Sequence, residues 1–166
     1  MSALIQGGLP CAEITFRTAA APEAIKAIAQ RDDMLVGAGS VRHAQQLADV
    51  KSAGATFAVS PGASPNLLHA ADDLGMPFVP GAATPSEMIN LLDHGYRLQK
   101  FFPAELSGGH AFLKAVSAPL PEVMFMPTGG ITADNAADYL RLANVSCVGG
   151  SWIAPSSLQA AGDFAA

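Results

Sequence analysis

The chain has 166 residues, of which 50% are hydrophobic and 14% are charged, a size and composition that suit one domain with a substantial core. The formal net charge of -5 argues against the basic surface of a nucleic-acid-binding protein. Two cysteines are too few for a disulfide framework or a zinc site, no apolar run approaches the ~18 residues of a membrane span, and the start lacks a signal-peptide pattern. We therefore expect a cytoplasmic protein.

Short apolar segments alternate with helical segments along the chain, and many of them end at a glycine or a proline. Residues 1–6 are the end of a helix that Gly7 and Gly8 stop. Strands are predicted at residues 10–16, 34–38, 56–59, 77–79, 97–102, 123–126 and 146–148. Helices are predicted at residues 22–30, 42–53, 65–74, 85–94, 110–117 and 133–143, with a short helix after Pro155. This alternation predicts a parallel α/β sheet.

The repeat of strand and helix indicates a barrel. Eight such units close a (β/α)8 TIM barrel, and a polar signal after every strand favours this fold over an open doubly wound sheet. Seven strands are visible, and a complete barrel rarely has fewer than ~200 residues. We therefore expect residues 1–166 to form a single incomplete barrel domain, whose first strand would precede Met1.

Lys100 lies on a predicted strand that stops at Pro103, because proline cannot donate to the ladder. Side chains alternate across a strand, so Leu98, Lys100 and Phe102 share one face. Burial of a lysine amine among apolar neighbours lowers its pKa, and a neutral amine attacks carbonyl carbon atoms. Schiff-base chemistry is the functional interpretation. The structural alternative is a lysine at a strand end whose amine extends to water.

Polar residues gather where the predicted strands end, which is where barrels place their active sites. Glu13, Thr15 and Arg17 share one face of their strand, and in a barrel that face points inward, where charge usually serves a site. A structural ion pair between Glu13 and Arg17 is the alternative. The strand ends elsewhere carry Ser40, Thr84, Lys100, Thr128 and Ser151. The four histidines show no ligand spacing and are interpreted as surface residues.

The last two predicted strands end in glycine pairs, Gly129-Gly130 and Gly149-Gly150. Glycine lets backbone N–H groups approach an anion closely, and the loops after the last two strands of such barrels frequently bind phosphate. A single pair is more often only a turn. Two pairs, one strand–helix unit apart, predict a phosphate site.

The sequence resembles the 2-keto-3-deoxy-6-phosphogluconate (KDPG) and 4-hydroxy-2-oxoglutarate (KHG) aldolase family over nearly its whole length. Six runs carry the resemblance: AEITFRT at 12–18, VGAGSV at 36–41, SPG at 60–62, KFFPAE at 100–105, PTGGI at 127–131 and GGSW at 149–152. It implies a (β/α)8 barrel, a homotrimer, and a class I lyase of the Entner–Doudoroff pathway without cofactor or metal. The implied reaction is reversible cleavage of the phosphorylated keto acid to pyruvate and glyceraldehyde 3-phosphate.

The resemblance also implies roles for individual residues. Lys100 would be the Schiff-base lysine, and Glu13 would act as general acid and base through a water. Arg17 and Ser40 would hold the pyruvate carboxylate, although the family commonly has threonine where Ser40 stands. An arginine suits a carboxylate because its donors bind both oxygens.

The remaining implied roles concern the rest of the substrate. Phe102 would pack on the imine carbon chain, and Thr128 would contact a substrate hydroxyl. The phosphate would be bound by Gly129, Gly130, Gly149, Gly150 and Ser151.

The chain departs from the family pattern at both ends. The family has a first strand and most of a first helix before Met1, and a longer last helix after Ala166. We therefore expect a truncated barrel with two exposed sheet edges. Two alternatives remain: a catalytically impaired remnant that binds a phosphosugar, or another phosphate-binding barrel, such as a thiamine-phosphate-synthase-like enzyme, which would not need Lys100 inside.

Overall fold

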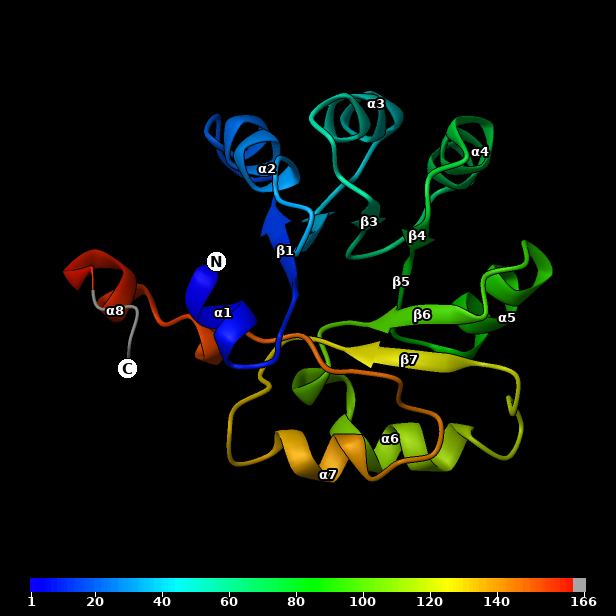
Figure 1. Cartoon of the computed structure of the whole chain (residues 1–166). Coiled ribbons are helices and arrows are strands. Elements are labelled where there is room, and N and C mark those ends of the chain that lie inside the picture. Colours follow the sequence, from blue (N-terminus) through cyan, green and yellow to red (C-terminus); the bar gives the residue numbers. More distant parts are fainter. Residues whose placement is uncertain (163–166) are drawn as a thin grey trace. The chain divides into compact units, whose positions relative to one another are not determined.

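The computed structural model describes residues 1–162, which fall into two compact units divided between Pro80 and Gly81 (Figure 1). Both units are built from parallel strands joined by helices, which confirms the predicted α/β alternation. No helix within residues 1–162 is long and apolar enough to cross a membrane.

The first unit contains a four-stranded parallel sheet in the order β1-β2-β3-β4. Its strands are β1 (Cys11–Thr15), β2 (Leu35–Gly39), β3 (Phe57–Val59) and β4 (Phe78–Val79). Its helices are α1 (Ser2–Gln6), α2 (Ala21–Ala29), α3 (Ala44–Ser52) and α4 (Pro65–Leu74). The register of β1 on β2 pairs Glu13 with Gly37 and Thr15 with Gly39.

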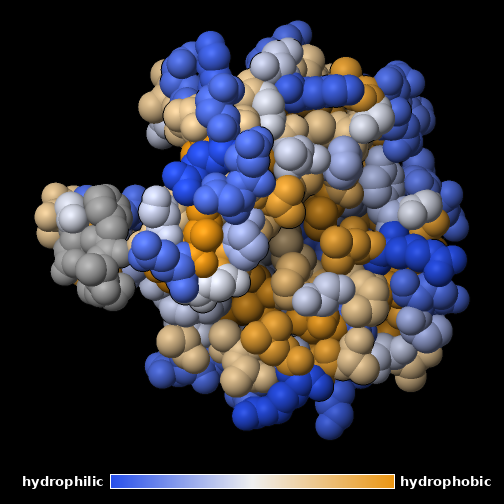
Figure 2. All heavy atoms as spheres, in the orientation of Figure 1, coloured by the Kyte–Doolittle hydropathy of each residue, from blue (hydrophilic) through white to orange (hydrophobic). Residues whose placement is uncertain are grey.

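Helices α2, α3 and α4 lie along one side of this sheet (Figure 1). Helix α2 buries Ala21, Ile25 and Ile28, a spacing that puts all three on one face. Hydrophilic residues gather over these outer helices (Figure 2). Helix α4 has a well-defined start and end, because Ser64 Oγ accepts from the Leu67 N–H at 3.3 Å and Gly75 is left-handed.

The second unit contains a three-stranded parallel sheet in the order β5-β6-β7. Its strands are β5 (Gly81–Ala82), β6 (Leu98–Phe101) and β7 (Met124–Pro127). Its helices are α5 (Pro85–Asp93), α6 (Gly109–Val116), α7 (Ala136–Leu140), α8 (Ser156–Ala161) and the 3-10 turns η1 (Glu105–Ser107) and η2 (Ser151–Ile153). Helices α6 and α7 lie along one side of β6 and β7 (Figure 1).

The core of the second unit is aromatic. Phe101 is fully buried on β6, stacks on Phe112 of α6 with ring centroids 5.1 Å apart, and meets Phe125 of β7 edge-on at 6.3 Å. Such pairs stabilise a core beyond their buried area. They fix β6 against its neighbours, and with it the residues that alternate with Phe101.

Two predicted strands differ from the structure. The strand predicted at residues 77–79 is present as β4, but it is followed after Pro80 by a further short strand, β5, that the sequence did not predict. The strand predicted at residues 146–148 is wrong: only isolated bridges form on either side of this segment, from Val145 to Phe125 and from Gly149 to Thr128. The N–H groups of Ser146 and Gly149, three residues apart, donate to Phe125 and Pro127, two residues apart. The segment therefore carries one extra residue relative to β7, which interrupts the ladder.

The helix predicted at residues 133–143 is shorter than expected, since α7 covers only Ala136–Leu140. Asn135 explains its late start. The side chain of Asn135 accepts from the Thr132 N–H at 2.8 Å and donates to the Gly130 carbonyl at 3.1 Å. These bonds hold the preceding residues in a turn, because asparagine competes with the backbone for hydrogen bonds.

Candidate active site

Lys100 lies on β6 with only 5% of its surface exposed. Its register neighbours are Gly81 on β5 and Met126 on β7, and its amine nitrogen lies 5.2 Å from the centroid of the Phe102 ring. The amine therefore does not extend to water, which was the structural alternative. A buried lysine above an aromatic ring is well placed to act as a nucleophile on a carbonyl.

The opposite face of β6 explains why Lys100 points away from the helices. Gln99 is fully buried there, and its amide donates to the Met88 carbonyl of α5 at 3.0 Å and to the Tyr96 carbonyl at 2.9 Å. Phe101 packs on the same side. Because strand side chains alternate, anchoring Gln99 and Phe101 to the helices directs Lys100 to the other face.

Beyond β6 and β7, the two loops pair backbone to backbone. The Ala104 N–H donates to the Thr128 carbonyl at 2.8 Å, and the Glu105 N–H donates to the Gly129 carbonyl at 3.1 Å. In the opposite direction, the Thr128 N–H donates to the Phe101 carbonyl at 3.0 Å. The end of the lysine strand and the first glycine pair therefore form one continuous block.

Gly129 and Gly130 both have left-handed backbones, with φ of 98° and 82°. A Cβ at Gly129 would lie 3.3 Å from the Phe102 ring, and a Cβ at Gly130 would lie 2.6 Å from Cγ of Glu105. Conformation and space both require glycine here.

The second glycine pair lies beside the first. The Gly149 N–H donates to the Pro127 carbonyl at 2.9 Å, and a Cβ at Gly149 would lie 2.7 Å from Oγ1 of Thr128. The Trp152 ring covers Gly150, and a Cβ at Gly150 would lie 1.7 Å from Cζ3 of that ring. Within residues 1–162, no backbone or side-chain acceptor takes a hydrogen bond from the N–H of Gly130, Gly150 or Ser151. These exposed donors are suited to an anion.

Glu13 lies on β1 in the first unit, with its carboxylate over the backbone of β2. A Cβ at Gly39 would lie 1.6 Å from Oε1 of Glu13, so the carboxylate fills the space that a side chain would take. Cys11 shares this face of β1. Burial, and to a smaller extent the charge of Glu13, raise the pKa of the Cys11 thiol above its usual value.

Arg17 and Ser40 follow the ends of β1 and β2. Arg17 is exposed, and its guanidinium lies 3.5 Å from Oγ1 of Thr15. Ser40 has a φ of 61°, the one positive φ of a non-glycine residue within residues 1–162. This conformation costs on the order of 1 kcal/mol, and such residues cluster at functional sites.

The predicted site residues thus fall into two sets, one in each unit. Glu13, Arg17 and Ser40 lie in the first unit. Lys100, Phe102, Thr128 and the two glycine pairs with Ser151 lie in the second unit. The inward orientation of the Glu13 face, which the sequence predicts for a barrel, stays a prediction. The four histidines are exposed, as predicted.

Thr84 has a structural role that the sequence analysis missed. Its hydroxyl accepts from the Glu87 N–H at 3.3 Å, and the Glu87 carboxylate accepts from the Thr84 N–H at 2.9 Å, which makes a capping box at the start of α5. A bond from the Ala83 N–H and those from Thr84 lower the pKa of Glu87. The T-x-x-E spacing of residues 84–87 could have predicted this capping box from the sequence.

Three further residues that the sequence analysis did not single out hold the first glycine loop: Glu105, Asn135 and Tyr139. Glu105 belongs to the KFFPAE run, but nothing in the sequence indicates that Tyr139 reaches it. No group of three or more His, Cys, Asp or Glu side chains within residues 1–162 is arranged to hold a metal ion.

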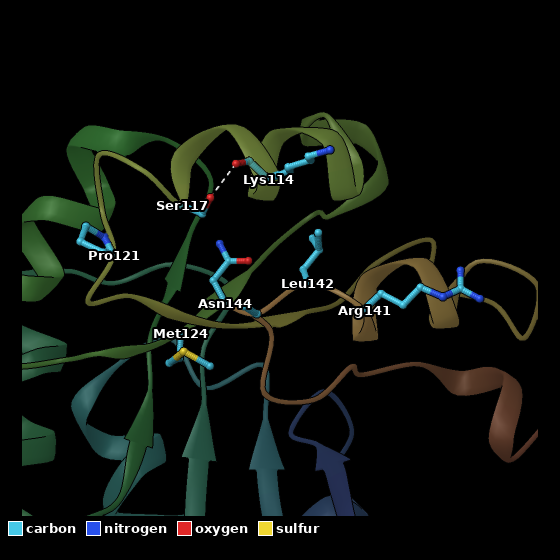
Figure 3. A pocket seen from close by; sticks show the side chains of 8 residues that line it. Lys114, Ser117, Pro121, Met124, Arg141, Leu142 and Asn144 are labelled. Carbon is cyan, nitrogen blue, oxygen red and sulfur yellow. Dashed lines mark hydrogen bonds between the residues drawn. The ribbon is translucent and has the colours of Figure 1, made fainter.

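A cavity of about 340 Å³ lies at the other end of the second unit, where β7 begins (Figure 3). Met124 lines it together with Lys114 and Ser117 of α6 and Arg141 after α7. None of the predicted site residues lines it. Ligands of parallel sheets bind outside the carboxyl ends of the strands. We therefore place the candidate site at the Lys100 end and not in this cavity.

Residues 1–166 match the family model described as KDPG and KHG aldolase. A 2-dehydro-3-deoxy-phosphogluconate aldolase of Pseudoalteromonas atlantica is 49% identical over 163 residues, which are 98% of this chain and 76% of that protein.

Two solved structures are also similar. The KDPG aldolase of Legionella pneumophila, with pyruvate captured as a covalent carbinolamine intermediate, has a TM-score of 0.95 and 44% identity over 99% of this chain and 80% of its own. The Zymomonas mobilis enzyme with 3-phosphoglycerate has a TM-score of 0.90 and 39% identity, covering 98% of this chain and 81% of its own. The parallel α/β fold is therefore of the TIM-barrel type, as predicted, and the chain belongs to the KDPG and KHG aldolase family.

Proposed function

We propose that this chain is a class I aldolase that reversibly cleaves 2-dehydro-3-deoxy-6-phosphogluconate to pyruvate and glyceraldehyde 3-phosphate. The observation that carries the proposal is Lys100, which is buried beside the Phe102 ring on β6, a strand whose end and following loop bond backbone to backbone with the first glycine loop. The same chemistry would cleave 4-hydroxy-2-oxoglutarate to pyruvate and glyoxylate. The family relationship supports this activity.

The first stage joins the substrate to the chain. The neutral Lys100 amine adds to the keto carbon and forms a carbinolamine, which loses water to give an iminium. The iminium accepts the electron pair of the breaking C–C bond and becomes an enamine, while the hydroxyl next to that bond loses its proton and becomes the aldehyde. The reaction needs no cofactor, because the iminium itself is the electron sink.

The second stage regenerates the free amine of Lys100. The enamine takes a proton at its terminal carbon, and water hydrolyses the resulting pyruvate imine, which releases pyruvate and the free amine. Glu13 would move these protons through a water, a task that suits a half-buried carboxylate.

The substrate would be held at both ends. Arg17 and Ser40 would bind the pyruvate carboxylate, Phe102 would pack on the carbon chain and Thr128 would contact a hydroxyl. The phosphate would be bound by Gly129, Gly130, Gly149, Gly150 and Ser151. The N–H groups of Gly130, Gly150 and Ser151 bond to no acceptor within residues 1–162, which supports this assignment. We further propose that the enzyme works in the cytoplasm as a homotrimer, on the basis of its family alone.

Borohydride reduction in the presence of pyruvate tests the proposal. The protein should gain the mass of one reduced pyruvate adduct, and peptide mapping should place it on Lys100. Lys114→Arg, which changes an exposed lysine of the same unit, should leave the adduct intact. A protein that binds phosphate but gains no adduct would be the impaired remnant instead.

A further inference from the structure

Tyr139 is a fully buried tyrosine of α7 whose hydroxyl donates a hydrogen bond to the Glu105 carboxylate. Glu105 begins η1, directly after the loop that follows the lysine strand. The imidazole of His110 meets the Tyr139 ring edge-on at 5.9 Å. The hydrogen bond between Tyr139 and Glu105 thus links α7 to the segment that follows the lysine strand.

Glu105 also covers the first glycine loop. Its N–H donates to the Gly129 carbonyl at 3.1 Å, and its Cγ occupies the space beside Gly130. A Cβ at Gly109 would lie 3.4 Å from Oε1 of Glu105 and 3.3 Å from the Tyr139 hydroxyl oxygen. The pair therefore lies between two left-handed glycines, Gly109 and Gly130, which leave it room.

The position of this carboxylate raises a problem for anion binding. An ionised carboxylate accepts hydrogen bonds and donates none, so it competes with phosphate for the same N–H groups. The Gly130 N–H is one such group, and Glu105 is the acidic residue beside it. Left free to turn, the carboxylate could take this donor or repel the incoming phosphate.

The Tyr139 hydroxyl offers the carboxylate another donor. A tyrosine hydroxyl keeps its proton at neutral pH, and burial and the hydrogen bond to Glu105 raise the pKa of Tyr139 further above its usual value.

We propose that Tyr139 and Glu105 are positioning residues for phosphate: Tyr139 fixes the Glu105 carboxylate away from the donors of the Gly129-Gly130 loop. The proposal rests on the phosphate-binding role given to that loop in the proposed function. It assigns neither residue to the chemistry at Lys100.

Three variants test it: Tyr139→Phe, Glu105→Gln and the double variant. Tyr139→Phe releases a charged carboxylate, and inhibition by inorganic phosphate should weaken about tenfold. Glu105→Gln keeps an acceptor for the tyrosine but removes the charge, so inhibition should stay within about twofold of the parent chain. The double variant has no charge to release and should recover most of the loss.

The kinetics should show that binding of the phosphate end of the substrate is affected, whereas the chemistry at its keto end is not. In Tyr139→Phe, KM for the phosphorylated keto acid should rise about tenfold, while borohydride trapping of pyruvate on Lys100 and kcat should change by less than about twofold. Asp138→Asn is the control on the same helix, because it removes an exposed ion pair with Arg141 and does not touch Glu105. A double variant as weak as Tyr139→Phe would overturn the proposal, as would equal losses in both single variants.

Calorimetric titration of the parent chain with inorganic phosphate distinguishes this proposal from the aldolase activity. If phosphate binds but pyruvate is not trapped, the proposed function fails, and calorimetric titration of the three variants with phosphate still decides the positioning role. If pyruvate is trapped but phosphate does not bind, the positioning role is overturned and the Schiff-base chemistry stands.

Discussion

The strand-end residues of the two units are held in place by different means. In the first unit, Glu13 is positioned by the space over Gly39, and Ser40 by its own left-handed backbone. In the second unit, the loop at Gly129 is held by bonds from two other segments, through Glu105 and Asn135. The comparison shows that steric contact at a single backbone position shapes the first set, whereas a network of bonds holds the second.

Lys100→Arg should have the largest effect. Arginine keeps the charge but cannot form the imine, so turnover should fall by orders of magnitude. The measurement is cleavage of the phosphorylated keto acid, with Lys114→Arg as the matched control. Near-normal cleavage by Lys100→Arg would remove Lys100 from the mechanism.

Gly39→Ala tests the dependence on single positions in the first unit. The new methyl would displace the Glu13 carboxylate from the space that it fills over Gly39. Turnover should fall about 10²- to 10⁴-fold, as for loss of a general acid or base.

Gly62→Ala is the control for this variant, because nothing lies within 4 Å of its Cβ position. If Gly39→Ala turned over like Gly62→Ala, the space over Gly39 would have no part in placing Glu13.

Gly130→Ala tests the network of the second unit. Its Cβ would press on Glu105, and its left-handed backbone would be strained, so KM for the phosphorylated substrate should rise about tenfold. The free energy of unfolding should also fall by about 1 kcal/mol.

Gly95→Ala separates the two causes. Gly95 has a φ of 86° and open space around its Cβ position, so alanine there brings the strain without the contact. It should lose similar stability and keep its KM. A KM shift of equal size in both variants would contradict the role of the contact with Glu105.

The smallest effect is expected at the helix caps, which differ between the two units. Glu87→Gln should lower the stability of the second unit at pH 7 by about 0.5 kcal/mol, a value reduced for solvent screening. The folded pKa of Glu87 lies below the unfolded value near ~4.3, so this stability is present above that pH. It is lost as the pH falls through the folded pKa.

Ser64→Ala is the matched variant in the first unit. The Ser64 cap has no carboxylate, so its loss should cost about the same at pH 7 and pH 3. Denaturant unfolding at the two pH values measures both variants. A Glu87→Gln deficit that persists at pH 3 would show that the charge is not the cause.

A structural feature can be predicted from the sequence when it is determined by residues that are close together in the chain. Lys100 and the glycine pairs could be found because strand parity and glycine chemistry are properties of a few adjacent residues. The strand at residues 146–148 was mispredicted because the interruption comes from one extra residue relative to β7, which only pairing reveals. The bond between Tyr139 and Glu105 spans 34 residues, and no local pattern encodes it.

The left-handed backbone of Ser40 has a consequence for directed evolution. Glycine at this position would remove the strain and raise stability by about 1 kcal/mol, yet it would delete the hydroxyl proposed to hold the substrate carboxylate. A library screened for heat resistance should therefore enrich glycine at position 40, whereas a library screened for turnover should retain a hydroxyl. Sequencing position 40 after both screens would show which pressure keeps a serine in a conformation that suits glycine.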